Sequence, residues 1–158
     1  MKILRILSIQ YLKKKKMNKK YQAMVLSCID PRFQSKVFHY LKRKKLCGKY
    51  SSFTIAGAAV SITHASFKKW QKTFFENLST SIRLHKIDRL IVINHKDCGV
   101  VKFVNGIKKL NEINEKKIHE ESFKKLSKLL DKKFPKLNYE FYLMNLKGSI
   151  KNFNVQSL

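Results

Sequence analysis

The apolar run at residues 88–94 (DRLIVIN) places the strongest constraint on how this chain can fold. Strands that are apolar almost throughout occur in parallel sheets whose two faces are both covered by helices. Three other short runs, at 21–27, 52–56 and 139–146, also have the length and composition of strands. The chain is therefore expected to contain several buried, parallel strands.

Helical patterns separate these strand candidates. Residues 34–45, 99–110 and 120–133 are expected to be helical, and Pro135 follows the last of them. Between the second and third strands, large apolar side chains recur at three- and four-residue steps, which is the spacing of one helix face. These side chains are Phe67, Trp70, Phe74, Leu78 and Ile82. Strands that alternate with helices predict an α/β fold with a mostly parallel central sheet flanked by helices.

Length and composition indicate one globular domain. A chain of 158 residues that is 44% hydrophobic can bury a core. We expect a basic N-terminal tail at 1–20 and a single α/β domain at 21–158. The formal net charge is +25, but most cations are lysines spread along the chain, and arginine is rare. We interpret this excess as a solvated surface and do not expect a nucleic-acid partner, although a non-catalytic nucleic-acid-binding protein stays open as an alternative.

The cysteine content and the hydropathy indicate a cytoplasmic protein. Three cysteines are a small and odd number, which argues against a disulfide framework and favours a reducing compartment. No apolar run reaches the length of about 18 residues that a membrane span needs. The apolar patch near the start runs into four lysines without a small-residue cleavage site, so no signal peptide is expected. We expect no membrane partner.

Candidate metal ligands follow two of the predicted strands. Cys28 comes after the first strand, and His95 and Cys98 come after the third. Ligands bind at the carboxyl ends of strands in parallel α/β sheets, so these side chains can meet if the two strands are neighbours. Two thiolates and one imidazole form the ligand set of a catalytic zinc site that keeps its fourth position open. We therefore predict a zinc site at this edge of the sheet.

Asp30 and Arg32 lie beside the first ligand and are the candidate catalytic pair. In extended backbone, alternate residues share a face, so Cys28, Asp30 and Arg32 would all point into one pocket. Pro31 favours this arrangement because it biases the residue before it toward extended angles. The remaining histidines are expected to lie on the surface or to be fully hydrogen-bonded, and Cys47 is expected to be structural.

Cys28-x-Asp30-x-Arg32 followed by His95-x-x-Cys98-Gly resembles the signature of the β-class carbonic anhydrases. The element at residues 56–58 (AGA) is similar to that family's Ala-Gly element, and the resemblance runs from about residue 21 to 153. It implies that Cys28, His95 and Cys98 bind Zn²⁺, and that Asp30 and Arg32 form the catalytic dyad. It also implies that Gly57 helps to line a CO₂ pocket and that the protein is a homodimer or a higher homo-oligomer.

The implied reaction is the reversible hydration of CO₂ to bicarbonate. Zinc lowers the pKa of a bound water to about 7 in sites of this type, and the resulting hydroxide attacks CO₂. The chain departs from the common family pattern at Pro31, where Ser is usual, and at Thr54 and Ile55, where Arg-Asn is usual. These departures leave a second substrate class open, namely a CO₂ analogue such as carbonyl sulfide or carbon disulfide.

Overall fold

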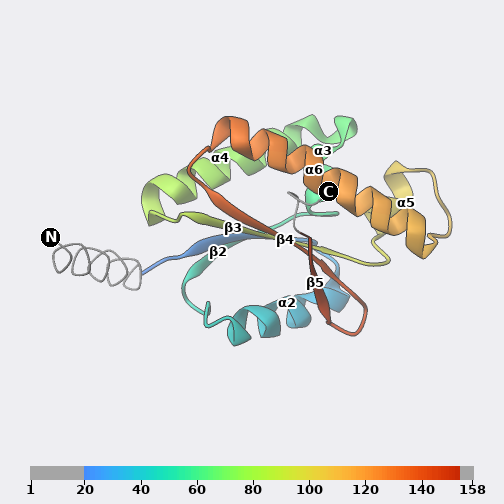
Figure 1. The fold of residues 1–158 in the computed structure, drawn as a ribbon, viewed down its shortest axis with the longest axis horizontal. Coiled ribbons are helices and arrows are strands. Elements are labelled where there is room, and N and C mark those ends of the chain that lie inside the picture. Colours follow the sequence, from blue (N-terminus) through green and yellow to red (C-terminus); the bar gives the residue numbers. More distant parts are fainter. Residues whose placement is uncertain (1–19, 154–158) are drawn as a thin grey trace, which may run out of the picture.

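Five strands form one sheet that runs through the middle of the molecule (Figure 1). The structure, a computed structural model, describes residues 20–153, so the predicted tail at 1–20 lies outside the described residues except for Lys20. The strands lie in the order β2-β1-β3-β4-β5, and all neighbours are parallel except β4 and β5. Their bounds are β1 Ala23–Ser27, β2 Tyr50–Thr54, β3 Arg89–His95, β4 Asn138–Met144 and β5 Ile150–Phe153. This confirms the predicted α/β fold.

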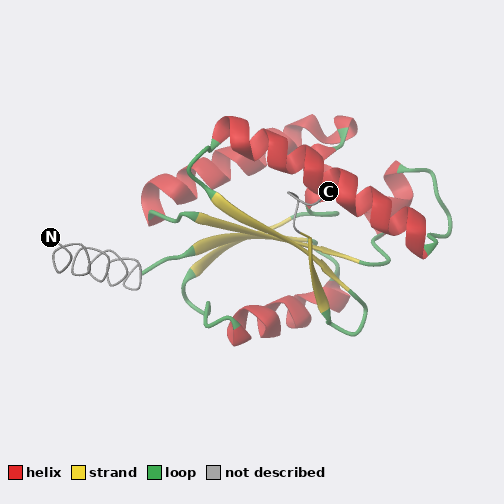
Figure 2. Cartoon of the chain, in the orientation of Figure 1, coloured by secondary structure: helices red, strands yellow, loops and turns green. Residues whose placement is uncertain are grey.

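Helices cover both faces of the sheet (Figure 2). Helix α2 lies on one face, and α3, α4, α5 and α6 lie on the other (Figure 1). Their bounds are α2 Pro31–Arg43, α3 Ala59–Thr63, α4 Lys68–His85, α5 Gly99–Val104 and α6 Glu112–Lys133. No helix within residues 20–153 is both long enough and apolar enough to cross a membrane.

Strand β3 is the centre of the core, as its composition predicts. Leu90 and Val92 pack in the cluster under α3, α4 and α6, whereas Ile91 and Ile93 pack in the cluster under α2. Successive side chains of a strand point to opposite faces, so a strand in the middle of a two-sided core has to be apolar at every position.

Several helix boundaries differ from the predicted ones. Helix α2 begins at Pro31, three residues earlier than expected, because the Asp30 side chain accepts a hydrogen bond from the Arg32 backbone N–H and caps the helix. Helix α6 begins at Glu112, eight residues early, and the Asn111 side chain caps it in the same way. Helix α5 ends at Val104, six residues short of the prediction.

Helix α3, the 3₁₀ helix at Ala65–Phe67 and strand β5 were not predicted. Helix α3 is only five residues long and contains β-branched residues, yet Ala59, Val60, Ser61 and Ile62 are buried. It follows a tight turn in which both Gly57 and Ala58 have positive φ. Strand β5 returns antiparallel to β4 after a turn at Lys147 and Gly148.

Phe74 and Phe75 lie in the same core although they are neighbours on α4. Both side chains are buried in the cluster beneath α4, and their ring centroids lie 5.2 Å apart. Phe75 is covered by the end of α6, where its ring lies 6.1 Å from that of Phe134. Because the chain itself covers both rings, neither of them indicates a partner surface.

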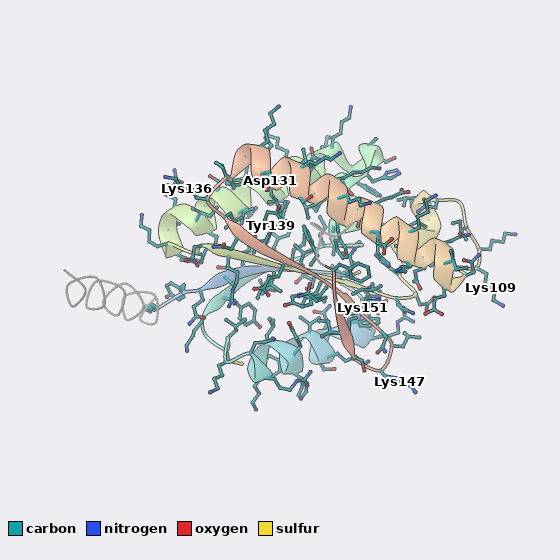
Figure 3. The ribbon with its side chains drawn as sticks, viewed as in Figure 1. Lys109, Asp131, Lys136, Tyr139, Lys147 and Lys151 are labelled. Atoms are coloured by element: carbon teal, nitrogen blue, oxygen red, sulfur yellow. The ribbon has the colours of Figure 1, made fainter. Side chains whose placement is uncertain are left out.

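Lysines extend into solvent from separate parts of the molecule. Lys109 lies in the loop before α6, Lys136 lies just before β4, and Lys147 lies in the turn after β4 (Figure 3). All three are exposed. Their separation agrees with the dispersed positions of lysines along the sequence.

Candidate metal centre

Three predicted ligands meet at the carboxyl ends of two neighbouring strands. Strands β1 and β3 pair in parallel with Ser27 opposite Ile93, so Cys28 and His95 leave the sheet at the same edge. Cys98 joins them from the position just before α5. All three side chains are buried, and their ligand atoms lie within 4.8 Å of one another. The three residues can therefore hold a metal ion.

His95 presents one ring nitrogen to this centre. Its Nδ1–H donates to the carbonyl of Lys96 over 2.8 Å, which leaves the lone pair on Nε2. Nε2 is buried and has no hydrogen-bond partner among residues 20–153. The ring stacks on the buried Phe33 with centroids 4.0 Å apart. A fixed imidazole with an unpartnered buried nitrogen fits a metal ligand whose other nitrogen is held by a carbonyl.

The two cysteines favour a bound cation for an electrostatic reason. A hydrogen bond from Cys98 lowers the pKa of Cys28 in spite of burial, and His95 and the Gly57 backbone N–H lower it further. The pKa of Cys98 is raised by its contact with Cys28 and by burial. Two adjacent buried thiols cannot both ionise unless a cation neutralises them. The donor set of two sulfurs and one nitrogen fits zinc.

Asp30 and Arg32 form an ion pair next to the ligands. Arg32 Nη2 donates to Asp30 Oδ2 over 2.7 Å, and Arg32 Nε donates to Oδ1 over 3.0 Å. These bonds lower the pKa of Asp30 to about 2. Asp30 Oδ2 lies 3.9 Å from His95 Nε2, which puts an ionised carboxylate beside the metal ligands.

The reason predicted for this proximity is wrong in part. Asp30 is extended, as Pro31 favours, with ψ of 119°. Arg32, however, lies in the first turn of α2, so the three side chains do not alternate along one strand. Arg32 reaches Asp30 because the helix begins between them and the long side chain folds back over the cap.

Sequence reasoning missed Asp97. Arg32 Nη1 donates to Asp97 Oδ2 over 2.9 Å, and Arg32 Nη2 donates to the Asp97 carbonyl over 3.0 Å. Lys102 pairs with the other carboxylate oxygen of Asp97. The backbone N–H of Asp97 donates to the Glu115 carboxylate over 2.5 Å. The only signal in the sequence was the position of this acid between two ligands.

His119 is also more deeply placed than predicted. It is buried, and Asn94 Nδ2 donates to its Nδ1 over 3.0 Å. Its Nε2 has no partner among the described residues, so the expectation of a surface or fully hydrogen-bonded histidine is wrong. Burial lowers the pKa of His119 to about 3. Asn94 also accepts from the Ala59 backbone N–H over 3.1 Å, and so joins β3 to α3 and α6.

Gly57 lies against the centre from the loop after β2. Its backbone N–H donates to Cys28 Sγ over 3.2 Å. The remaining histidines agree better with expectation, since His39 and His85 are exposed and hydrogen-bonded. Cys47 is exposed and forms no disulfide with another described cysteine, so the expectation that it is structural finds no support in its contacts.

Solved structures of similar fold include β-carbonic anhydrases. The β-carbonic anhydrase CafA of Aspergillus fumigatus superposes with a TM-score of 0.56 at 12% identity, over 94% of this chain and 82% of its own. One of two tetrameric β-carbonic anhydrases of Sordaria macrospora superposes with a TM-score of 0.56 at 13% identity, over 91% of this chain and 86% of its own. At these identities the likeness concerns the fold.

Sequence comparison identifies the family to which the chain belongs. An uncharacterized protein of Rickettsia bellii (strain RML369-C) is 26% identical over 129 residues, which cover 81% of this chain and 79% of the relative. The family described as putative carbonic anhydrase matches residues 17–139, a span that includes every ligand named above. The chain belongs to the putative carbonic anhydrase family.

Proposed function

We propose that this protein is a zinc-dependent carbonic anhydrase that reversibly hydrates CO₂ to bicarbonate. The observation that carries the proposal is the convergence of Cys28, His95 and Cys98 on one buried point, with His95 Nε2 left without a hydrogen-bond partner among residues 20–153. The family membership and the β-carbonic anhydrase fold support it.

The three ligands would hold Zn²⁺ and leave one position open. Two thiolates and a neutral imidazole balance the charge of the ion. When bound, zinc supplies a Lewis acid that turns water into a nucleophile near neutral pH. The hydrogen bond from His95 Nδ1–H to the Lys96 carbonyl keeps Nε2 free to bind, and the Gly57 N–H stabilises the thiolate of Cys28.

Asp30 and Arg32 would orient the reacting water. Asp30 accepts a hydrogen bond from this water, because its carboxylate lies beside the ligands and has a lowered pKa. Arg32 keeps the carboxylate ionised and in place through two hydrogen bonds. Asp30 would therefore orient the water toward CO₂, and we assign Asp30 and Arg32 the role of the catalytic dyad.

Gly57 would line the substrate pocket beside Cys28, to which its backbone N–H donates. An added Cβ at this position would lie 2.6 Å from Ser61 Oγ and 2.7 Å from Val100 Cγ1, so a larger residue would crowd the loop that faces the ligands. The substrate that we propose is CO₂, a small apolar molecule that needs space more than it needs polar contacts.

One purified sample tests this function. We expect about one zinc per chain by elemental analysis and CO₂ hydration in a stopped-flow pH-indicator assay. Carbonyl sulfide is assayed in parallel. Its hydrolysis without CO₂ hydration would show that the substrate is the analogue and not CO₂. A zinc-loaded protein that acts on neither gas would contradict the proposal.

We propose that the protein assembles as a homodimer or a larger homo-oligomer. The support is that the Sordaria macrospora relatives are tetrameric β-carbonic anhydrases of the same fold. Light scattering at micromolar concentration tests this, and a monomeric mass would contradict it.

We also propose that residues 21–158 act as one domain behind a basic tail at 1–20. We propose that the protein works in the cytoplasm, where thiolate ligands stay reduced.

A further inference from the structure

Asp97 occupies an unusual place in the chain, between the ligands His95 and Cys98. Its backbone has φ of 58°, a left-handed conformation that Asp and Asn tolerate better than other side-chain-bearing residues. Glu115, which is buried on α6, accepts a hydrogen bond from its backbone N–H over 2.5 Å. Lys102 on α5 pairs with its Oδ1. Side chains from two helices, α5 and α6, therefore hold Asp97 in place, in addition to its contacts with Arg32.

The remaining contacts of Asp97 go to Arg32. The guanidinium of Arg32 has two usable edges, and the edge formed by Nε and Nη2 holds the Asp30 carboxylate. The other edge, formed by Nη1 and Nη2, donates to Asp97 Oδ2 over 2.9 Å and to the Asp97 carbonyl over 3.0 Å. The planar group is thus fixed along both edges, although the Arg32 side chain is 46% exposed.

We propose that Asp97 is a positioning residue that holds the guanidinium of Arg32 and thereby keeps the Asp30 carboxylate beside the metal site instead of on it. This inference rests on the proposed function of the site. Asp30 Oδ2 lies only 3.9 Å from His95 Nε2, so a modest rotation brings a carboxylate oxygen to the ion. Carboxylate oxygens are good zinc ligands, and one bound there would take the open position.

The loss of Asp97 frees Arg32 because of where its side chain lies. A guanidinium that is almost half exposed and has lost the Asp97 carboxylate keeps only the backbone carbonyl as a partner on that edge, so its hydrogen bonds exchange with water more readily. Asp30 then loses its fixed partner and turns toward the cation. The expected consequence is a protein that still contains zinc but has lost the position for the reacting water.

Asp97→Asn is the sharpest test, since Asn keeps the shape and tolerates the same backbone conformation. Asp97→Gly is the second variant, because glycine accepts positive φ without strain and keeps the backbone carbonyl. Glu112→Gln is the matched control, since it breaks the ion pair of Glu112 with Lys96 on the same loop without touching Arg32. Each variant is made in the full chain and loaded with zinc.

The first readout does not depend on activity. The chain has five arginines, so the Arg32 Nε–H signal can be resolved by NMR and identified through its loss in Arg32→Lys. We expect its exchange with water to be at least about tenfold faster in both Asp97 variants and unchanged in Glu112→Gln. The second readout is a crystal structure of the Asp97→Asn zinc protein, in which we expect Asp30 to be a ligand. The third is kcat, which we expect to fall about tenfold or more at unchanged zinc content.

Slow Arg32 Nε–H exchange in both Asp97 variants would overturn the proposal. Faster exchange in Glu112→Gln would also overturn it, because the effect would then belong to the loop in general. If the unmodified zinc protein does not hydrate CO₂, the proposed function fails, whereas the exchange rate and the position of Asp30 still decide the role of Asp97.

Discussion

The backbone N–H of Gly57 donates a hydrogen bond to Sγ of Cys28 over 3.2 Å, from the loop after β2 to the residue after β1. Gly57 has φ of +78°, and its missing side chain lets this loop lie against Ser61 and Val100. A hydrogen bond to a thiolate stabilises the charged form. The loop therefore stabilises the ligand, and its close approach requires glycine.

Gly57→Ala should destabilise the fold and weaken the metal site. The new methyl would meet Ser61 Oγ at 2.6 Å and Val100 Cγ1 at 2.7 Å, and the positive φ adds strain. We expect a loss of about 3 kcal/mol or more in the free energy of unfolding. Gly48→Ala is the control, because Gly48 also has positive φ (+71°) but has no neighbour within 4 Å of the added atom. Chemical denaturation of both variants separates strain from crowding, and equal losses would show that crowding at Gly57 is absent.

Removal of any one ligand should release the metal. We expect Cys28→Ser, Cys98→Ser and His95→Ala to lose zinc on dialysis, and their Tm to fall by about 5 °C or more, because bound metal stabilises the folded state. Cys47→Ser should keep its zinc, since Cys47 is exposed and lies outside the cluster. Elemental analysis and thermal unfolding measure both effects. Full zinc content in Cys28→Ser would remove that residue from the ligand set.

Changes in the dyad should separate activity from metal content. Asp30→Asn and Arg32→Met should retain zinc and lose about 100-fold in kcat/KM, because the water loses its acceptor or the acceptor loses its partner. Arg43→Met, at the other end of α2, should behave like the unmodified protein. Stopped-flow hydration assays on samples of known zinc content decide the matter, and an active Asp30→Asn variant would exclude the proposed role of the carboxylate.

His119 should make the fold sensitive to acid. Burial lowers its pKa to about 3 in the folded protein, below the value of about 6.5 in an unfolded chain. The unfolded state therefore binds the proton more readily, and the contribution to stability is complete above pH 6.5 and is lost as the pH falls toward 3. We expect a loss of up to about 1.4 kcal/mol per pH unit within this window.

Urea unfolding at pH 7.5 and 5.5 measures this dependence. His119→Asn should lose much of the pH dependence, whereas His39→Asn, at an exposed position on α2, should keep all of it. Effects of acid on the metal ligands are common to all three proteins and cancel in the comparison. An equally steep dependence in His119→Asn would assign the acid sensitivity to other groups.

The sequence predicted the long elements because each carries a strong periodic pattern. Strand β3 is apolar on both faces. Phe74, Leu78 and Ile82 of the predicted helix face pack in the core cluster, whereas Phe67 and Trp70 lie outside it and stack on each other. Helix α3 could not be predicted, since its five residues form a helix only because the turn at Gly57 and Ala58 buries them. The start of α2 was predictable in principle. Asp30 followed by Pro31 is typical of a helix cap and first turn, whereas the prediction used the pair only as a sign of extended backbone.

The site also contains residues that the local sequence predicts and residues that only distant contacts bring into place. Its three ligands stand close to strand ends, where residue type and spacing carry the information. Asp97 could not be assigned, because its partner Arg32 lies 65 residues away and Glu115 lies 18 residues away. His119 was misplaced because α6 was expected to begin after it, and only the packing of α6 on β3 buries its ring.

The pairing of β1 with β3 has a consequence for how the chain finds its fold. Cys28 and His95 come together only when Ser27 lies opposite Ile93. A slip of two residues would preserve the buried faces of both strands but would move the two ligands apart by about 6.6 Å along the strand. A bound metal ion would therefore discriminate against misaligned sheets that hydrophobic burial alone tolerates, and metal supply during synthesis would influence how many chains reach the correct alignment.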